Sequence, residues 1–227
     1  MTSLGKKLAA EFLGTFAFVL VGAGSAVAAR FFGTGDQVSL LIAALANGLG
    51  LAVAISATMA VSGGALNPAV TLGLYVGKKL PGRDVLPYMI AEVAGALLAG
   101  LALVVSLPSS LGNPVVWGAP TLSSTLTTTQ GTLLELLMTL FLVFAVFGTA
   151  VDPRAPKIGG FGIGIAGVAD VLLGGPFTGA AMNPARAIGP MLAAGFLPSY
   201  WYIYWLGPLA GGVIAALAYR FALSDGS

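Results

Sequence analysis

The chain has 227 residues, of which 57% are hydrophobic and 8% are charged, and its formal net charge is +2. Soluble domains carry roughly 25% charged residues, so this composition predicts an integral membrane protein. The small net charge gives no indication of nucleic-acid binding, and the absence of Cys and His excludes disulfides, thiol catalysis and the usual metal ligands. We therefore expect no cofactor and no metal site.

Continuous apolar runs predict membrane-spanning helices, because a β-barrel would require alternating patterns instead. In chain order the runs cover residues 8–29, 38–60, 86–106, 131–151, 159–173 and 200–221. Two shorter helical patterns, at 67–76 and 183–194, each begin with Asn-Pro-Ala. The expected fold is an all-α membrane domain over 1–227, with six spanning helices and two re-entrant half-helices.

The two halves of the chain resemble each other. Residues 10–16 match 134–140 at an offset of 124, and residues 62–69 match 178–185 at an offset of 116. We predict a first repeat at 8–106 and a second at 131–221, joined by a loop at 107–130 that is rich in Pro, Gly, Ser and Thr. Three spans per repeat is an odd number, so the repeats are inverted, a plan that places the solute path at their interface.

Basic residues are distributed unevenly between the two predicted sides. Arg30 flanks one side, and the other side carries Lys6, Lys7, Lys78, Lys79, Arg83, Arg154, Lys157 and Arg220. This excess marks the cytoplasmic side of a membrane protein. We therefore expect a multi-pass protein of the cell membrane with both termini in the cytoplasm.

The repeated tripeptide suits a helix that starts inside a membrane. Asn67 and Asn183 are good capping residues, Pro68 and Pro184 suit the first helical position, and the small alanines Ala69 and Ala185 permit close approach of the two helix starts. Each start carries the positive end of a helix dipole, which repels cations near the midplane. We expect the two Asn amides to donate hydrogen bonds to a passing water molecule.

Irregular backbone at that depth is tolerated only where it lines a cavity or is buried in protein. The loops before the two tripeptides are therefore expected to line the solute path with the carbonyl groups of Gly63, Gly64, Ala65, Gly179, Ala180 and Ala181.

Four segments carry a resemblance to a known family: Ala10-Glu11-Phe12, Ser62 to Thr71, Thr178 to Arg186, and Tyr204 to Leu209. With these segments the chain resembles the aquaporin or major intrinsic protein family over essentially its whole length. The resemblance implies a homotetramer in membrane lipid, with a pore in every subunit and passive conduction without protons.

Counting from the two motifs locates the positions of the family's selectivity filter at Asn47, Val171, Ala180 and Arg186. Water-selective members resemble one another in having an aromatic residue and His at the first two positions, and neither is present here. Arg186 retains the family pattern, and its guanidinium offers donors to solutes and a barrier to cations. We expect a wider opening than in a water filter.

Other family signatures conflict about the solute. Glycerol facilitators have Asp after the filter Arg, whereas this chain has Ala187, and the pair Tyr204-Trp205 is expected of water channels. We predict a channel for water and small uncharged solutes such as glycerol or urea. A strictly water-selective channel is the alternative.

Acidic residues within the spans require separate explanations, since such groups are often functional. The resemblance implies that Glu11 and Glu135 brace the re-entrant loops. Asp170 would either hold the loop that carries Arg186 or face the pore, and we favour the bracing role. A proton relay through these carboxylates would instead make the protein a coupled transporter.

Other classes of function fit the residues less well. A coupled transporter usually has an ion-coupling group at the midplane, where this chain has two neutral amides. A non-conducting structural protein remains an alternative. Ser, Glu and Asp form no catalytic set, so we expect no enzyme and no catalytic residues. Glycines within the spans, Gly22 among them, are expected to serve helix packing.

Overall fold

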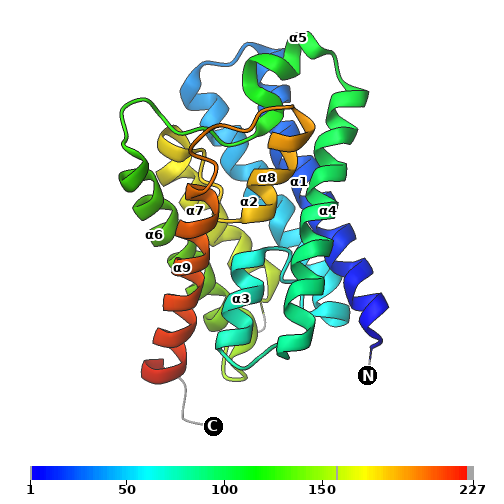
Figure 1. Cartoon of the computed structure of the whole chain (residues 1–227), viewed down its shortest axis with the longest axis vertical. Coiled ribbons are helices and arrows are strands. Elements are labelled where there is room, and N and C mark those ends of the chain that lie inside the picture. Colours follow the sequence, from blue (N-terminus) through cyan, green and yellow to red (C-terminus); the bar gives the residue numbers. More distant parts are fainter. Residues whose placement is uncertain (1, 157, 224–227) are drawn as a thin grey trace.

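The computed structural model describes residues 2–156 and 158–223, and their regular elements are helical (Figure 1). Six helical stretches are long and apolar enough to span a membrane. They are α1 (Leu4–Phe32), α2 (Asp36–Ser62), α4 (Gly82–Ser106), α6 (Thr128–Val146) with the π-helical turn η2 (Phe147–Val151), α7 (Gly160–Thr178), and α9 (Ile203–Ala218) with η3 (Tyr219–Leu223). The predicted all-α membrane architecture is confirmed.

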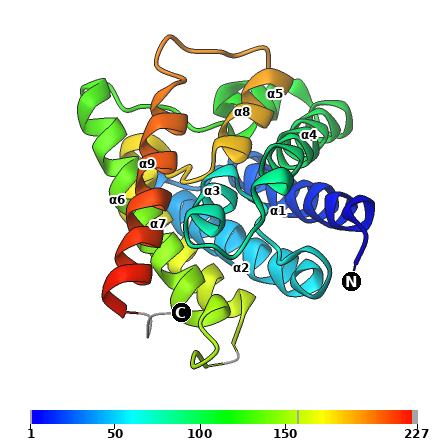
Figure 2. The same ribbon diagram turned by 60° about the horizontal axis from the view of Figure 1, so that its bottom comes forward.

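The two short helices lie in opposite halves of the molecule. Figure 1 shows α3 (Pro68–Val76) in the lower half and α8 (Pro184–Ala193) in the upper half, each inside the ring of long helices. The same ring is seen obliquely in Figure 2. The connection between the halves is more ordered than a plain loop, because it contains α5 (Ser109–Gly112) and the 3₁₀ turn η1 (Asn113–Gly118), which packs on α1.

The end of α7 differs from the expectation that its apolar run stops at residue 173. The helix continues to Thr178, with Pro176 in its last turn. A proline there removes only one backbone hydrogen bond. The helix ends at Gly179, whose left-handed conformation (φ 77°) lets its N–H donate to the Gly175 carbonyl.

The two halves interlock around the centre. Helix α2 packs against α7, while each half-helix packs against a long helix of the other half, α3 on α9 and α8 on α4. At the α2–α7 crossing, a β-carbon on Gly48 would lie 2.5 Å from the Gly164 carbonyl oxygen. The two backbones can approach this closely only because both residues are glycine.

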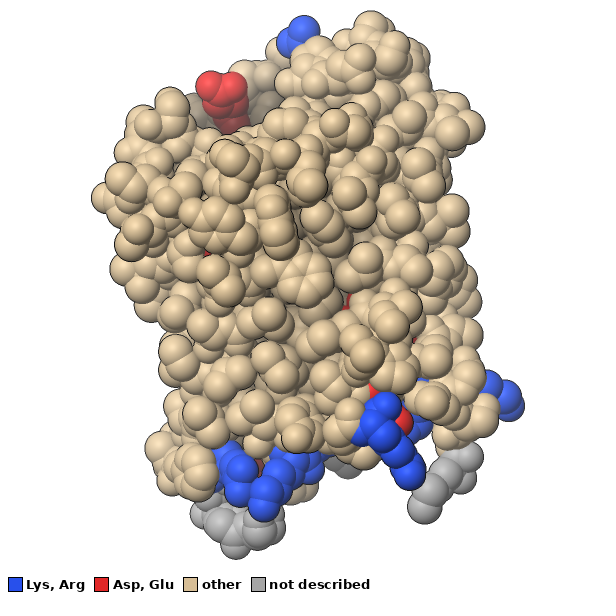
Figure 3. All heavy atoms as spheres, in the orientation of Figure 1, with Lys and Arg blue, Asp and Glu red and all other residues tan. Residues whose placement is uncertain are grey.

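Basic side chains gather at one end of the molecule. Figure 3 shows Lys and Arg concentrated at the end where α1 begins and η3 ends, whereas Arg30 lies in the last turn of α1 at the opposite end. Lys157, which the sequence assigns to the basic side, lies outside the described residues. The charge asymmetry thus coincides with the two ends of the helical ring.

Candidate functional site

Both Asn-Pro-Ala tripeptides begin helices. Asn67 precedes α3, and its Oδ1 accepts the Ala69 N–H at 2.8 Å. Asn183 precedes α8, and its Oδ1 accepts the N–H groups of Ala185 at 2.9 Å and Arg186 at 3.1 Å. The oxygen of each amide is therefore used to cap its own helix, which leaves the amide nitrogen free to point away from it.

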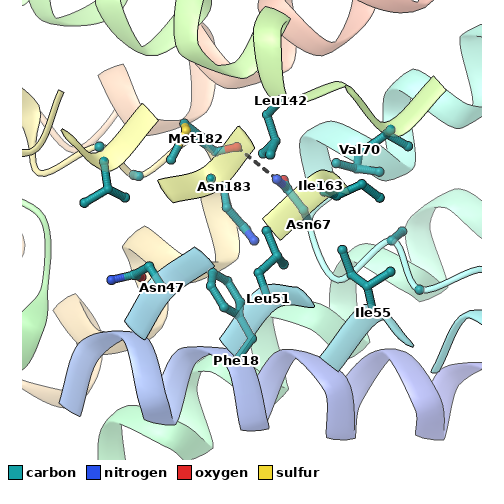
Figure 4. Close-up of a pocket in the computed structure, with 17 residues that line it drawn as sticks. Phe18, Asn47, Leu51, Ile55, Asn67, Val70, Leu142, Ile163, Met182 and Asn183 are labelled. Atoms are coloured by element: carbon teal, nitrogen blue, oxygen red, sulfur yellow. Dashed lines mark hydrogen bonds between the residues drawn. The ribbon is translucent and has the colours of Figure 1, made fainter. Parts of the chain in front are cut away.

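The two caps are joined by reciprocal hydrogen bonds at the centre of the molecule. Asn67 Nδ2 donates to the Met182 carbonyl at 2.9 Å (Figure 4), and Asn183 Nδ2 donates to the Leu66 carbonyl at 2.8 Å. An amide nitrogen carries two hydrogens, so each Asn keeps one donor for another partner. The predicted donation to a passing water molecule is compatible with that remaining hydrogen, and the cross-links between the two caps are an additional contact that was not predicted.

A central cavity of about 30 Å³ passes these caps, and both Asn67 and Asn183 line it. A second cavity of about 720 Å³ adjoins it and reaches the end of the molecule where Arg30 and Asp36 lie. The positive ends of the two half-helix dipoles therefore face each other along the wall of a passage, where they disfavour cations.

The four predicted filter residues lie where the two cavities meet. Asn47 and Val171 line both cavities, Ala180 lines the central one, and Arg186 lines the outer one. They come from α2, α7, the loop before α8 and α8 itself. Residues distant in the sequence are thus brought to one narrow zone.

Arg186 is the charged side chain of that zone. Its side chain is buried, and neither Nε nor Nη1 has a hydrogen-bond partner among the described residues. Buried polar groups normally find a partner, and an unpaired guanidinium is costly. Nε and Nη1 are enclosed as well as unpaired, so they do not themselves face a solute, while Arg186 as a residue lines the outer cavity at the filter.

The comparisons with known proteins agree with this geometry. The family model for the major intrinsic protein family matches residues 1–219. The chain belongs to the major intrinsic protein family. Among similar relatives, aquaporin TIP4-4 of Zea mays is 44% identical over 92% of this chain and 83% of its own length, and probable aquaporin TIP3-2 of Arabidopsis thaliana is 40% identical over 94% and 82%. Among solved structures, the aquaglyceroporin from Plasmodium falciparum has a TM-score of 0.80 at 22% identity, covering 97% of both chains, which supports the fold.

In this major intrinsic protein, Glu11 supports the first re-entrant loop. Its two carboxylate oxygens accept the N–H groups of Ala65 at 3.1 Å and Leu66 at 2.7 Å. Leu66 has a positive φ of 50°, which is unfavourable for a side chain with a Cβ. A buried carboxylate thus holds a strained backbone segment beside the Asn67 cap.

Glu135 supports the second loop in the same way. Its Oε1 accepts the Thr178 hydroxyl at 2.7 Å and the Ala181 N–H at 3.0 Å, and its Oε2 accepts the Met182 N–H at 2.7 Å. Met182 and Ala180 also have positive φ, at 51° and 44°. The two glutamates therefore occupy equivalent positions in the two repeats.

The apolar wall of the central cavity is the part of the site that the sequence analysis missed. Its residues are Phe18, Leu51, Ile55, Leu142, Val146 and Ile163. The repeat contained the signal, because Phe18 and Leu142 are separated by the offset of 124, and Ile55 and the filter residue Val171 by the offset of 116.

Asp170 occupies neither of the two positions expected for it. It lines neither the central nor the outer cavity, it forms no ion pair with Arg186, and its Oδ2 is buried without a partner in the described part of the chain. The physical reason is the helical turn of about 100° per residue: because Val171 faces the passage, its neighbour Asp170 points to one side, into the buried interior, where it is 3% exposed.

The predicted carbonyl residues divide between the cavities. Gly64, Ala65, Ala180 and Ala181 line the central cavity, and Gly179 lines the outer one. Gly63 lines neither, because it ends α2 with a φ of 96° and donates its N–H to the Met59 carbonyl. The carbonyl role of Gly63 stays a prediction.

Proposed function

We propose that this protein is a passive transmembrane channel for water and small uncharged solutes that excludes ions and protons. The observation that carries the proposal is the pair of opposed helix starts, cross-linked by Asn67 and Asn183 within one cavity. Relatives named aquaporins and a structural neighbour named an aquaglyceroporin support it.

The residues suggest how conduction and exclusion are combined. Along the apolar wall a water molecule finds few partners, so it moves quickly and keeps its bonds to neighbouring waters. At the caps, the remaining donors of Asn67 and Asn183 turn its oxygen toward the helix starts. Because a water held in this way accepts from the protein, it does not pass a proton along the file. The positive helix ends and Arg186 add an electrostatic barrier to cations.

The solute range follows from the filter. Val171 and Ala180 are small, and Asn47 is smaller than an aromatic residue, so this zone admits molecules wider than water. Arg186 offers donors to a hydroxyl or carbonyl oxygen. We infer that glycerol, urea or similar solutes pass as well as water.

The remaining features of the proposal concern its setting. We propose a homotetramer with one pore in each subunit, in the lipid of the cell membrane, with both termini on the basic, cytoplasmic side. The repeats at 8–106 and 131–221 form a single channel domain. The protein is proposed to have no catalytic activity, no cofactor and no nucleic-acid partner.

Stopped-flow light scattering on reconstituted vesicles tests the function. We expect water, glycerol and urea to move faster than in empty vesicles, without saturation and without dependence on an ion gradient. Movement of water alone would establish a strictly water-selective channel. Saturation with gradient dependence would indicate a coupled transporter, and no flux above empty vesicles a structural protein.

A matched pair of variants on α2 tests whether water passes through the central cavity. Leu51 is buried and lines it, whereas Leu49 is exposed on the outer surface of the same helix. Leu51→Trp is expected to reduce water flux to the level of empty vesicles, and Leu49→Trp to leave it unchanged. Equal effects of both variants would contradict a path through this cavity.

A further inference from the structure

One glycine of α1 lies directly against a filter side chain. A β-carbon on Gly22 would overlap Oδ1 of Asn47, and would lie 2.9 Å from its Cγ and 3.4 Å from its Nδ2. The amide of Asn47 therefore occupies the space that a side chain at position 22 would fill. Gly22 thus packs, as expected of a glycine within a span, but its packing partner is Asn47, a residue that lines the solute path.

Hydrogen bonds hold the Asn47 amide in that space. Its Nδ2 donates to the Ala43 carbonyl at 2.8 Å and, more weakly, to the Gly22 carbonyl at 3.4 Å. These two bonds use both amide hydrogens. Figure 4 shows the amide end of Asn47 turned away from the Asn67 and Asn183 caps. Asn47 thus lines the passage mainly with its stem, and its donors are satisfied by the protein.

The second repeat shows the alternative arrangement. Val146 follows Gly22 by the repeat offset of 124, and Ile163 follows Asn47 by the offset of 116. Both Val146 and Ile163 line the central cavity. The inner half of the passage has the side chains of Val146 and Ile163 in its wall. At the corresponding positions the outer half has Gly22 and Asn47, whose amide is hydrogen-bonded to the protein. Only the outer end of the passage therefore has a glycine at this repeat position, because the inner end has Val146 there.

We propose that Gly22 is a specificity-determining position, which sets the width of the outer constriction by accommodating the Asn47 amide beside α1. A side chain at position 22 displaces the amide, and the open space beside Asn47 is the passage itself, because Asn47 borders both cavities. The inference rests on the proposed function and extends it to a residue that lines neither cavity. Solutes larger than water depend most on this width.

Gly22→Ala is the direct test, measured as glycerol and water permeability in reconstituted vesicles. We expect the glycerol-to-water ratio to fall about tenfold, which corresponds to about 1.4 kcal/mol in relative barrier height. Gly22→Ala combined with Asn47→Ala is expected to restore the ratio, because no amide remains to be displaced. If the parent conducts water alone, water permeability itself is expected to fall and to be restored in the same way.

Gly24→Ala provides the matched control on the same helix. Its β-carbon would meet only the end of the Leu103 side chain, at 3.2 Å, away from the filter. We expect its ratio to equal that of the parent. Asn47→Leu, which keeps the approximate size but cannot donate to either carbonyl, is expected to lower the ratio without any change at Gly22, so the test does not depend on the folding of one variant.

The outcomes separate the two proposals. A parent protein with no flux above empty vesicles would contradict the proposed function. A conducting parent whose permeabilities are unchanged by both Gly22→Ala and Asn47→Leu would overturn the role of Gly22 alone. A loss that Asn47→Ala fails to restore would also overturn it, because the effect would then come from helix packing.

Discussion

Removal of the Glu135 carboxylate should destabilise the protein in proportion to the donors that it leaves without an acceptor. Glu135 is fully buried and accepts the N–H groups of Ala181 and Met182 as well as the Thr178 hydroxyl. Glu135→Leu keeps a similar volume but removes every acceptor. Glu135→Gln keeps one oxygen, at the position that serves Ala181 and Thr178, and leaves Met182 facing an amide donor.

The expected magnitude follows from the number of orphaned backbone groups. Each buried N–H without a partner costs about 1–3 kcal/mol, so Glu135→Gln should cost about 1–3 kcal/mol and Glu135→Leu about 2–6 kcal/mol. A total stability of about 5–15 kcal/mol makes the larger loss a substantial part of the whole. Since the freed segment includes residues with positive φ, water permeability should fall together with stability.

Unfolding in detergent, followed by fluorescence of the three tryptophans, measures the effect. Leu133→Ala is the control, because Leu133 lies on the same helix with 54% of its surface exposed. We expect the order Leu133→Ala, Glu135→Gln, Glu135→Leu from least to most destabilised. A Glu135→Leu protein as stable as the parent would refute the bracing role and the reasoning behind it.

Three further predictions concern the filter and the basic end. Asn47→Phe should reduce glycerol or urea flux more than water flux in stopped-flow measurements, and equal losses would count against Asn47 as a filter residue. Arg186→Leu should raise cation leak by about tenfold or more, since a fixed charge within about 4 Å of a passing cation is worth several kcal/mol in a protein environment; a dye-reported leak equal to that of the parent would contradict this. Asp152 accepts hydrogen bonds from Arg154 and Tyr219, which lower the pKa of its carboxyl. A lowered pKa means that this contact is fully present above the ordinary value of 3.8 and is lost only as the pH falls through the lower, folded-state value. Trypsin cleavage after Arg154 should therefore be independent of pH between about 6 and 8, apart from trypsin's own pH profile. Cleavage should be faster at every pH in Asp152→Asn. Cleavage of this variant at the parent rate would show that Asp152 does not restrain the segment.

The sequence predicted the architecture well because the determining signals are local and repeated. Asn67 and Asn183 each combine a capping residue with a following proline, and this pattern specifies a helix start without any tertiary information. The odd number of spans per repeat then determines that the two starts come from opposite sides. The family resemblance, and not the physical pattern, supplied the filter positions.

The details that the sequence did not predict depend on side-chain direction and on contacts between distant segments. The hydrogen bond from Asn67 to Met182 joins residues of different repeats, and no local pattern contains it. Asp170 and Val171 are neighbours in the chain, yet only one faces the passage, because helix rotation separates them. The sequence predicts only a packing role for Gly22, since its contact with Asn47 exists only when α1 and α2 are in place.

The most direct test of a pore between the two half-helices uses the fact that the chain has no cysteine. Val171 lines both cavities, whereas its neighbour Leu172 has 44% of its surface exposed on the outside of the helical ring. Water permeability of vesicles is measured before and after a mercurial reagent, and again after an added thiol. We predict reversible block of Val171→Cys to the level of empty vesicles, with the parent and Leu172→Cys unaffected. Block of the parent, or equal block of both variants, would contradict the account.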